Sequence, residues 1–399
     1  MAIRLKKTKT AKEVDDAFWL RHQFYVKEEG YFSSIENEYL TDHFDSHPCC
    51  ANILAYEGDE PVGTLRINVD TGTGLPVDEY YDFSLHRKKI ADQWESDVGE
   101  QPRIGCAGML AIRKPWRNRR DVIRALFKMG ATIGYSSGVT HIIATVNIKS
   151  KTMYRRIGFE ALEEKVWIEK IGEYIVPMAC PFEAYYKWAM EGLLESSKLL
   201  DMFSSHFQWL VLSPGEVVFD QGDEANEAYI IDSGVVSIVR KYNHDKKEVM
   251  LASLGHGELF GEMSLIEAKS RSAKAVAMSN TELVSLGRDD FLAFLYKQPA
   301  RMADIMQRIS GRLRHATELV GMLISGTAQQ RLEFACNDLY HLAVPDVGQT
   351  GTYVTMIDAT EFVRNAGVSE EEGRQVLDAK VNENIIEYSR RKIRFLKQL

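Results

Sequence analysis

The chain has 399 residues, of which 45% are hydrophobic and 27% are charged, and this length predicts two to four domains instead of a single core. The composition excludes a collagen-like or largely disordered chain, and no apolar run approaches the roughly 18 residues of a membrane-spanning helix. The net charge of −8 argues against a protein that coats nucleic acid, although it leaves room for a local basic patch.

Three composition regimes follow one another along the chain. Residues 1–193 alternate apolar strands with helical segments, which predicts an α/β layer fold. Residues 194–325 combine short, glycine-punctuated strands, typical of a β-barrel or roll, with a long helix. Residues 326–399 are helical and end in a short basic strand. We therefore predict a multidomain α/β plus β protein with three domains, whose first boundary, near residues 193–198, rests on composition alone.

The cysteines and histidines predict neither disulfides nor a metal site. The five cysteines include no Cys-x-x-Cys pair, and the basic N-terminus lacks the apolar stretch of a secretory signal. Reduced thiols in a cytoplasmic protein are the expectation. His43, His47 and His141 lack metal-ligand spacing, so no metal is expected.

The first domain carries charged residues in a recurring arrangement. They lie in the segments Arg21–Gly30, Asp42–Asp45 and Gly63–Arg66, and the turn Gly58-Asp59, after the strand-like run Asn52–Tyr56, predicts a hairpin. A single surface carboxylate is more often structural than catalytic, but carboxylates in a pocket can orient or deprotonate an ammonium group. The spacing of the whole set therefore favours a site for a small amine.

A predicted strand, Met109–Ile112, leads into a strongly basic stretch and then a helix at 121–134. Residues 113–128 hold seven Lys or Arg against one Asp. Such density favours a phosphate group or an acidic protein partner. A solvated basic face is the alternative.

The segment Asn147–Phe159 carries a candidate general acid. When an amine attacks a thioester, a thiolate leaves, and the phenol of Tyr154 can donate a proton to it. The alternative is that Tyr154 is a packed aromatic residue before the Gly158-Phe159 turn.

Together, these segments resemble the GNAT acyltransferase superfamily. The resemblance implies that Asn147 lies along pantetheine and that Tyr154 faces the thioester sulfur. It also implies that the backbone of Leu110, Ala111 and Ile112 binds pantetheine, and that a loop with Arg117, Arg119 and Arg120 holds a pyrophosphate. Arg120 and Val122 stand where the superfamily has glycines, so acyl carrier protein is expected as the donor in preference to coenzyme A.

The charged segments of the first hundred residues are similar to those of N-acyl amino acid synthases and acyl-homoserine-lactone synthases. Both groups join a fatty acyl thioester to an amine. The resemblance implies an acceptor pocket of Arg21, Asp42 and Arg66. The Glu and Arg that those groups place on the strand aligned with residues 105–112 are missing here, so the general base is expected to be Glu28 or Asp45.

The second domain contains a compact set of residues suited to a cyclic nucleotide. A guanidinium binds two phosphate oxygens, a helix start offers backbone N–H groups, and a carboxylate accepts from a ribose hydroxyl. Gly261, Glu262, the turn Met263–Leu265 and Arg271 supply all of these. The stretch closely resembles the phosphate-binding cassette of the cyclic-nucleotide-binding domain family, over roughly residues 200–325. The resemblance implies a ribose contact for Glu262, a phosphate contact for Arg271, and a cassette that also includes Met263, Ser264 and Ser272. A degenerate roll that has lost its ligand is the alternative.

A long helix follows the cassette. Its apolar residues are spaced 4, 3, 4, 3, 4 and 3 apart, at Met302, Met306, Ile309, Leu313, Ala316, Val320 and Leu323. This heptad seam predicts either a homodimer helix or a helix packed on its own domain. Residues 311–323 resemble the dimer helix of the catabolite-activator branch, which implies cyclic AMP as the effector and a purine contact from Thr317. The branch has two adjacent hydroxyl residues at this point, and here Ala316 stands in place of the first. The resemblance favours cyclic AMP over cyclic GMP.

The C-terminal segment resembles a degenerate winged-helix domain of the same branch. The predicted helices are Thr360–Ala366 and Ser369–Val381, and the final strand is Lys392–Leu396. Ser369 is a suitable N-cap, but Glu370, Glu371 and Glu372 would repel a phosphate backbone where a recognition helix enters DNA. DNA binding is therefore not expected.

The sequence thus predicts an acyltransferase domain at 1–193, a cyclic-nucleotide domain at 194–325 and a degenerate winged helix at 326–399. The predicted function is cyclic-AMP-controlled transfer of a fatty acyl group from a thioester to an amine such as an amino acid. Two alternatives remain, a cyclic-AMP-dependent transcription factor and a cyclic-AMP-controlled protein-lysine acetyltransferase.

Overall fold

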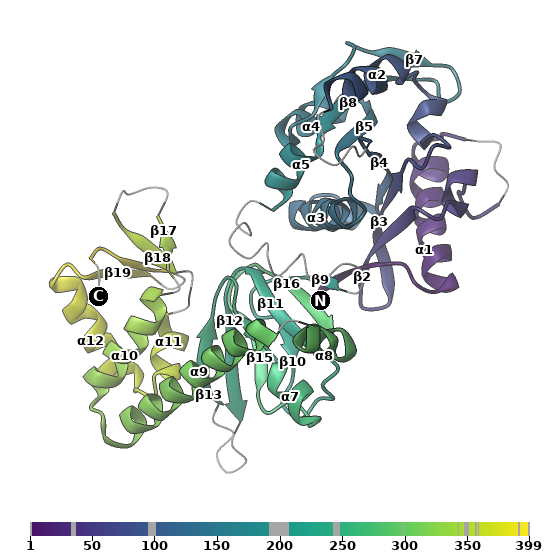
Figure 1. Ribbon diagram of the computed structural model, residues 1–399. Helices are drawn as coiled ribbons and strands as arrows, with labels where there is room; N and C mark the ends of the chain where they lie inside the picture. The colour runs from purple at the N-terminus through teal and green to yellow at the C-terminus, as the bar shows by residue number, and fades with distance from the viewer. Residues whose placement is uncertain are drawn as a thin grey trace. The chain divides into compact units, whose positions relative to one another are not determined.

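A computed structural model describes residues 2–32, 37–94, 101–190, 207–241, 248–297, 299–341, 343–346, 351–355, 357, 359–389 and 392–397. The chain forms two compact units, an N-terminal unit of residues 3–211 and a C-terminal unit of residues 212–399 with the extreme N-terminus (Figure 1). The predicted boundary near residues 193–198 falls in the range 191–206, outside the described residues. Within the described ranges, no helix is both long enough and apolar enough to cross a membrane.

A mostly antiparallel sheet forms the centre of the N-terminal unit. Its strand order is β9-β1-β2-β3-β4-β5-β8-β6, with β7 paired to β8, and β4 and β5 are parallel. The predicted hairpin is confirmed as the turn between β2 and β3, where Gly58 has a φ of 60°. The bounds are β1 Ile3–Lys7, β2 Cys50–Glu57, β3 Glu60–Val69, β4 Ile104–Ile112, β5 His141–Asn147, β6 Glu160–Ala161, β7 Val166–Ile168, β8 Glu173–Pro181 and β9 Gln208–Leu212.

Helices cover both faces of this sheet, with α1 and α3 on opposite sides of β2 and β3 (Figure 1). Helix α1 starts at a capping box in which Thr10 and Glu13 satisfy each other's backbone N–H groups, and it continues into a π-helical turn, η1. Helix α3 buries most of one face, as its period of apolar residues predicts. The helices are α1 Ala11–Arg21, η1 His22–Glu28, η2 His43–Ser46, η3 Pro76–Glu79, α2 Ser84–Gln93, η4 Lys114–Trp116, α3 Arg120–Ser136, η5 Ile148–Ser150, α4 Lys151–Ile157 and α5 Phe182–Ala189.

Antiparallel strands form a roll in the first part of the C-terminal unit. One group pairs in the order β14-β11-β16 and the other in the order β10-β15-β12-β13. Between the groups, the rings of Phe219, Tyr229 and Phe260 pack within 6.0 Å of one another. The bounds are β10 Val217–Phe219, β11 Glu227–Ser233, β12 Val236–Lys241, β13 Glu248–Leu254, β14 Leu259–Phe260, α7 Glu262–Glu267, β15 Lys274–Ala277, β16 Thr281–Gly287 and α8 Arg288–Lys297.

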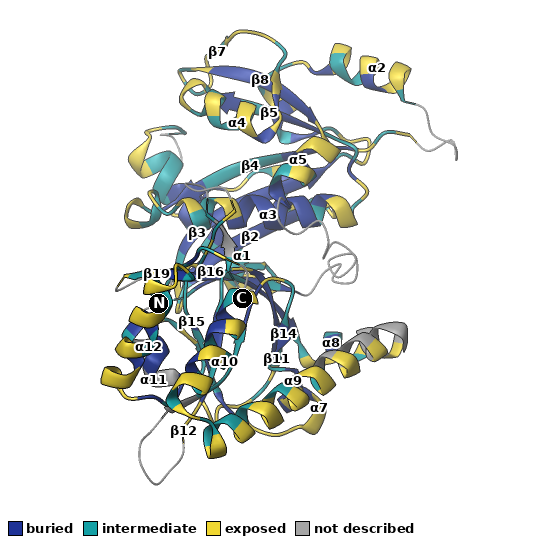
Figure 2. Cartoon of the chain, turned by 90° about the vertical axis from the view of Figure 1, so that its left-hand side faces the viewer, coloured by how far each residue is buried: buried dark blue, intermediate teal, exposed yellow. Residues whose placement is uncertain are grey.

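The predicted long helix is confirmed as α9, Pro299–Ser325. Much of its surface is exposed, in contrast to the buried α3 (Figure 2). Three residues of the heptad seam, Met306, Leu313 and Val320, are 62%, 69% and 53% exposed. The seam is therefore not covered by its own unit over this stretch.

Helices and a small sheet complete the C-terminal unit. The predicted helices at 360–366 and 369–381 are present as α11 and α12, and the Ser369 side chain accepts a hydrogen bond from the Glu372 N–H at the N-cap of α12. His315 of α9 stacks on Phe334 of α10 and lies 3.2 Å from the Asp338 carboxylate. The sheet order is β17-β18-β20-β19. The bounds are α10 Ala328–His341, β17 Val344–Pro345, β18 Tyr353–Thr355, α11 Ala359–Asn365, α12 Glu370–Asn382, β19 Ile386–Ser389 and β20 Lys392–Phe395.

Candidate functional site

The parallel strands β4 and β5 separate partway along their length. They pair through Ile104 and Gly105, although β4 continues to Ile112 and β5 to Asn147. Residues 107–110 are only partly buried, and a Cβ added at Gly108 would meet no atom within 4 Å. The two strands therefore diverge toward their carboxyl ends, where backbone groups of β4 leave the ladder and need other partners; this gap in the strand pairing is called the β4–β5 cleft.

A bulge shapes the β4 side of this cleft. Met109 has a φ of 52°, and the β3–β4 register shifts beside it. The Tyr25 hydroxyl donates to the Leu110 carbonyl over 3.0 Å, and Arg117 Nε donates to the Ile112 carbonyl over 2.7 Å. Two carbonyls of the predicted donor-binding strand thus accept hydrogen bonds from side chains of the same chain.

Tyr154 lies on α4, which follows β5 at the cleft. Its ring packs edge-on against Phe127 and Phe159, at centroid distances of 6.1 and 5.2 Å. Gly158, with a φ of 105°, ends α4 in a left-handed conformation and allows the chain to turn back. Burial raises the pKa of Tyr154 to about 12, so the phenol keeps its proton at neutral pH, as a general acid requires.

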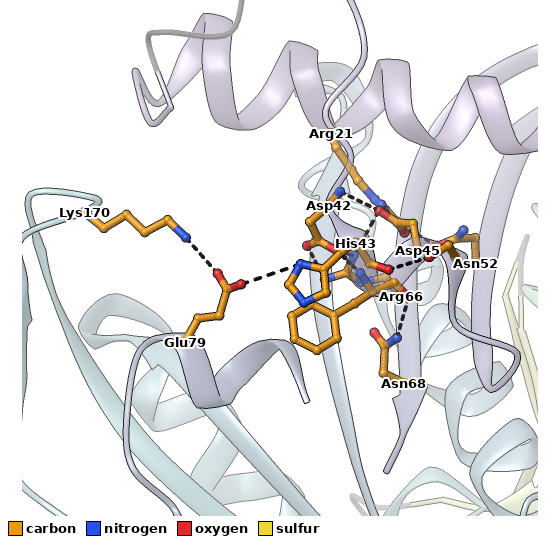
Figure 3. Close-up of polar contacts among 11 residues, drawn as sticks. Arg21, Asp42, His43, Asp45, Asn52, Arg66, Asn68, Glu79 and Lys170 are labelled. Atoms are coloured by element: carbon orange, nitrogen blue, oxygen red, sulfur yellow. Dashed lines mark hydrogen bonds and ion pairs between the residues drawn. The ribbon is translucent and has the colours of Figure 1, made fainter. Parts of the chain in front are cut away.

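An Arg–Asp cluster, made of Arg21, Asp42, Asp45 and Arg66, lies beside the cleft strands (Figure 3). Arg66 binds both oxygens of Asp42, over 2.7 and 2.9 Å, and approaches Asp45 at 3.1 Å. Arg21 donates to Asp45 over 2.8 Å and also to Asn52. The structure thus brings together all three predicted acceptor-pocket residues and one predicted base.

The charges of the Arg–Asp cluster are largely balanced within it. Arg21 and Arg66 are almost completely buried. Burial raises the pKa of the Asp45 carboxyl, but the Arg21 and Arg66 guanidinium groups outweigh burial and hold that pKa below its ordinary value. A carboxylate held in this way is a weak proton acceptor, which makes Asp45 a poor general base.

The turn between β7 and β8 contacts η3, which in turn lies close to η2. Lys170 binds Glu79 of η3 over 2.7 Å, and the Glu79 carboxylate lies 3.9 Å from Nδ1 of His43 (Figure 3). At the first residue of β8, Glu173 accepts a hydrogen bond from the Tyr31 hydroxyl. The pairing of Tyr31 with Glu173 leaves no local signal in the sequence, because 142 residues separate the two.

The other predicted base and the predicted donor loop meet each other. Glu28, at the end of η1, pairs with Arg117 and lies 3.9 Å from the Lys114 ammonium. Arg119 donates hydrogen bonds to both carboxylate oxygens of Asp121. Arg120, the first residue of α3, is exposed. In the basic stretch, Arg117 is therefore paired with Glu28, whereas Arg120 is exposed at the surface.

The cassette of the C-terminal unit is built around a buried acid and a buried arginine. Gly261, with a φ of 75°, is the N-cap of α7, and a Cβ there would lie 2.8 Å from Arg271 Nη1. Glu262 and Arg271 are 2% and 3% exposed. Of the other predicted cassette residues, Ser264 is buried, whereas Met263 and Ser272 are exposed.

Arg271 is held by backbone and aromatic groups. Its two terminal nitrogens donate to the carbonyls of Gly261, over 2.8 Å, and Glu227, over 2.6 Å. The guanidinium lies 4.2 Å from the Phe219 ring centroid, and its buried Nε has no hydrogen-bond partner in the described part of the chain. Burial lowers the pKa of Arg271, so an anion bound beside the guanidinium would stabilise its charged form.

An arginine that the sequence did not single out connects α9 to the cassette. Arg312 Nη1 lies 3.1 Å from Glu262 Oε1, and Nη2 donates to the Leu259 carbonyl. Burial raises the pKa of Glu262, and the Arg312 charge opposes that rise. Thr317, the predicted purine contact, is exposed and donates to the Leu313 carbonyl of its own helix.

Comparison with known proteins supports the assignment of both units. Residues 16–181 match the N-acyl amino acid synthase FeeM family, and residues 209–298 match the cyclic nucleotide-binding domain. The cyclic AMP receptor protein of Thermus thermophilus is 33% identical over 187 residues, which cover 47% of this chain and 83% of that relative. The chain belongs to the cyclic AMP receptor protein family.

Two further relatives correspond to single parts of the chain. A CRP-like cAMP-activated global transcriptional regulator of Mycobacterium tuberculosis is 29% identical over 110 residues, covering 28% of this chain and 49% of that protein. The solved structure of FeeM, an N-acyl amino acid synthase from uncultured soil microbes, is 17% identical with a TM-score of 0.38, covering 49% of this chain and 99% of that one. The FeeM-type domain supports acyltransferase activity, and the cyclic nucleotide-binding domain supports regulation by a cyclic nucleotide.

The end of this receptor-family segment carries an acidic helix start. Glu370, Glu371 and Glu372 form the first turn of α12. Carboxylates there suit the positive end of the helix dipole, but they oppose a phosphate backbone.

Proposed function

We propose that the protein is a GNAT-type N-acyltransferase that moves a fatty acyl group from a thioester to an amine such as an amino acid, under the control of cyclic AMP. The observation that carries this proposal is the position of Tyr154 on α4, which follows β5 at the β4–β5 cleft of a FeeM-type domain, with its ring packed against Phe127 and Phe159. The proposed domains are 1–193, 194–325 and 326–399, the last a degenerate winged helix.

The proposed reaction assigns roles to both sides of the cleft. The thioester lies along β4 with Asn147 beside its pantetheine arm, and the amine approaches from the Arg–Asp cluster. The amine nitrogen attacks the thioester carbonyl, the carbon–sulfur bond breaks, and Tyr154 donates its proton to the leaving thiolate. Arg21, Asp42 and Arg66 shape the acceptor pocket; Arg66 pairs with Asp42, and Asp45 joins Arg66 to Arg21, which holds that wall rigid.

The proposed control acts through α9. Cyclic AMP would place its phosphate against Arg271 and Ser272 and its ribose hydroxyl against Glu262. Glu262 is paired with Arg312, so a ligand that competes for Glu262 also acts on α9. Coupling between two sites of this kind is typically about 1–3 kcal/mol, or about 5- to 150-fold in affinity.

Mass spectrometry tests the function directly. Lipid extracts of cells that express the chain should contain N-acylated amines that are absent with Tyr154→Phe. With purified protein, acyl transfer should respond to cyclic AMP in the wild type and not in Arg271→Ala. Turnover that ignores the nucleotide at both subsaturating and saturating substrate would mean that the sensor serves another partner.

A DNA-binding role is the second candidate, because the chain belongs to the cyclic AMP receptor protein family. The acidic first turn of α12 argues against it. A mobility-shift assay with and without cyclic AMP separates the two functions, and a nucleotide-dependent shift on a defined duplex would favour the second.

We predict that the chain is a homodimer through the seam between Met302 and Leu323. Leu313 is 69% exposed in one chain, so Leu313→Glu would place like charges across the seam with little effect on the monomer fold. Light scattering should report a monomer for Leu313→Glu and a dimer for the control Gln307→Glu, which lies off the seam. A dimer in both variants would exclude this interface.

We predict that acyl carrier protein is used in preference to coenzyme A. The loop before α3 lacks glycines, and the exposed Arg120 at the first residue of α3 can steer an acidic partner. This steering is screened beyond about 8 Å at physiological ionic strength, so the rate with acyl carrier protein should fall as salt rises. Both donors should be compared at two salt concentrations, and equal or better use of acyl-coenzyme A would refute the preference.

A further inference from the structure

The hairpin β7–β8 places the carboxylate of Glu173 near the carboxyl end of β5. Glu173 is the first residue of β8, and two residues later Ile175 pairs with Asn147, the last residue of β5. The Glu173 side chain therefore lies near the end of β5, just before the helix that bears Tyr154. It accepts a hydrogen bond from the Tyr31 hydroxyl.

The carboxylates that the sequence favoured as the base are held by cations. Glu28 pairs with Arg117, and Asp45 lies between Arg21 and Arg66. The described partner of Glu173 is instead the neutral phenol of Tyr31.

Two tyrosines, Tyr31 and Tyr25, connect Glu173 to the β4 bulge. The rings of Tyr25 and Tyr31 stack at a centroid distance of 6.4 Å and an angle of 28°. Burial raises the pKa of Tyr25, and the neighbouring Tyr154 and Tyr31 add to that rise, so Tyr25 lies within electrostatic reach of both. Tyr25 also fixes the β4 bulge through the Leu110 carbonyl. The Tyr31–Glu173 pair is thus connected to the β4 bulge through Tyr25.

We propose that the Tyr31–Glu173 pair accepts the proton that the attacking amine loses. This inference rests on the proposed acyltransferase function. As the nitrogen–carbon bond forms and the carbon–sulfur bond breaks, the amine proton passes to the Tyr31 oxygen, and the Tyr31 proton passes to the Glu173 carboxylate. Tyr154 protonates the thiolate, and solvent then carries one proton from Glu173 back to Tyr154, so protons and charge balance. Tyr31 is the catalytic residue of the pair, and Glu173 acts through it.

The test combines conservative substitution with chemical rescue. Tyr31→Phe and Glu173→Gln should each lower kcat/KM by about 100-fold, the lower end of the usual contribution of general base catalysis, while KM for the donor stays unchanged. Glu173→Ala should recover at least about tenfold of its lost rate with sodium formate, and not with sodium chloride at the same ionic strength. The control Glu164→Ala, exposed and near the same hairpin, should keep the wild-type rate with or without formate.

Each outcome bears on a different claim. An active wild type with unchanged Tyr31→Phe and Glu173→Gln rates overturns the pair alone. Reduced rates that formate does not restore assign Glu173 a structural role and also overturn the proposal. A wild type that transfers no acyl group from either donor removes the proposed function, and the pair falls with it.

Discussion

Replacing Arg271 by alanine should abolish most of the affinity for cyclic AMP. Truncating one partner of a buried, hydrogen-bonded charge pair costs about 2–5 kcal/mol. At about 1.4 kcal/mol per tenfold, that cost corresponds to a loss of about 30- to 4,000-fold. Arg271 is 3% exposed and lies beside the N-terminus of α7, so water cannot replace its guanidinium. Isothermal titration calorimetry measures the change.

A graded series controls this experiment. Arg271→Lys keeps the charge but cannot bind two oxygens at once, so its affinity should fall between those of the wild type and Arg271→Ala. Lys269→Ala removes a nearby cation whose surface pair with Glu267 is solvent-screened, and it should bind as the wild type does. Unchanged affinity in Arg271→Ala would reject the phosphate contact and favour a roll that has lost its ligand.

Replacing Tyr154 by phenylalanine should lower kcat by about 100-fold or more without raising KM for either substrate. General acid catalysis typically contributes that much, and the substitution removes only the hydroxyl. Phenylalanine keeps the edge-on contacts with Phe127 and Phe159, so the fold should be retained. Because burial raises the pKa of Tyr154 to about 12, the wild-type rate should show no loss from its ionisation between pH 6 and pH 9.

The matched control for Tyr154→Phe is Tyr296→Phe, which removes a hydroxyl from a side chain that is 80% exposed on α8. Steady-state kinetics with circular dichroism on all three proteins separates catalysis from folding. A full rate in Tyr154→Phe would leave Tyr154 as a packed aromatic residue and require another acid.

The secondary structure was largely predictable because its signals are local. The hairpin turn at Gly58, the seam of α9 and the N-cap Ser369 all act within a few residues, and each is present. The family assignment also followed from short motifs. Burial on both faces of β2 agrees with its sequence, since residues 53–56 form a continuous apolar run.

The cassette was predictable for the same reason. Gly261, Glu262 and Arg271 span eleven residues, and the geometry of one turn and one helix start brings them together. Arg312 was missed because 50 residues separate it from Glu262, and its position depends on how α9 packs on the roll.

In the N-terminal unit, the sequence by itself determined which residue types were present, and only the tertiary structure decided which of them are paired. Arg21 and Asp45 are 24 residues apart, Glu28 and Arg117 are 89 apart, and Tyr31 and Glu173 are 142 apart. The proton affinity of a carboxylate depends on the charges within a few ångströms, and sheet pairing, not sequence distance, sets those neighbours. The folded chain therefore weakens Asp45 as a base and brings a different carboxylate, Glu173, to the mouth of the cleft.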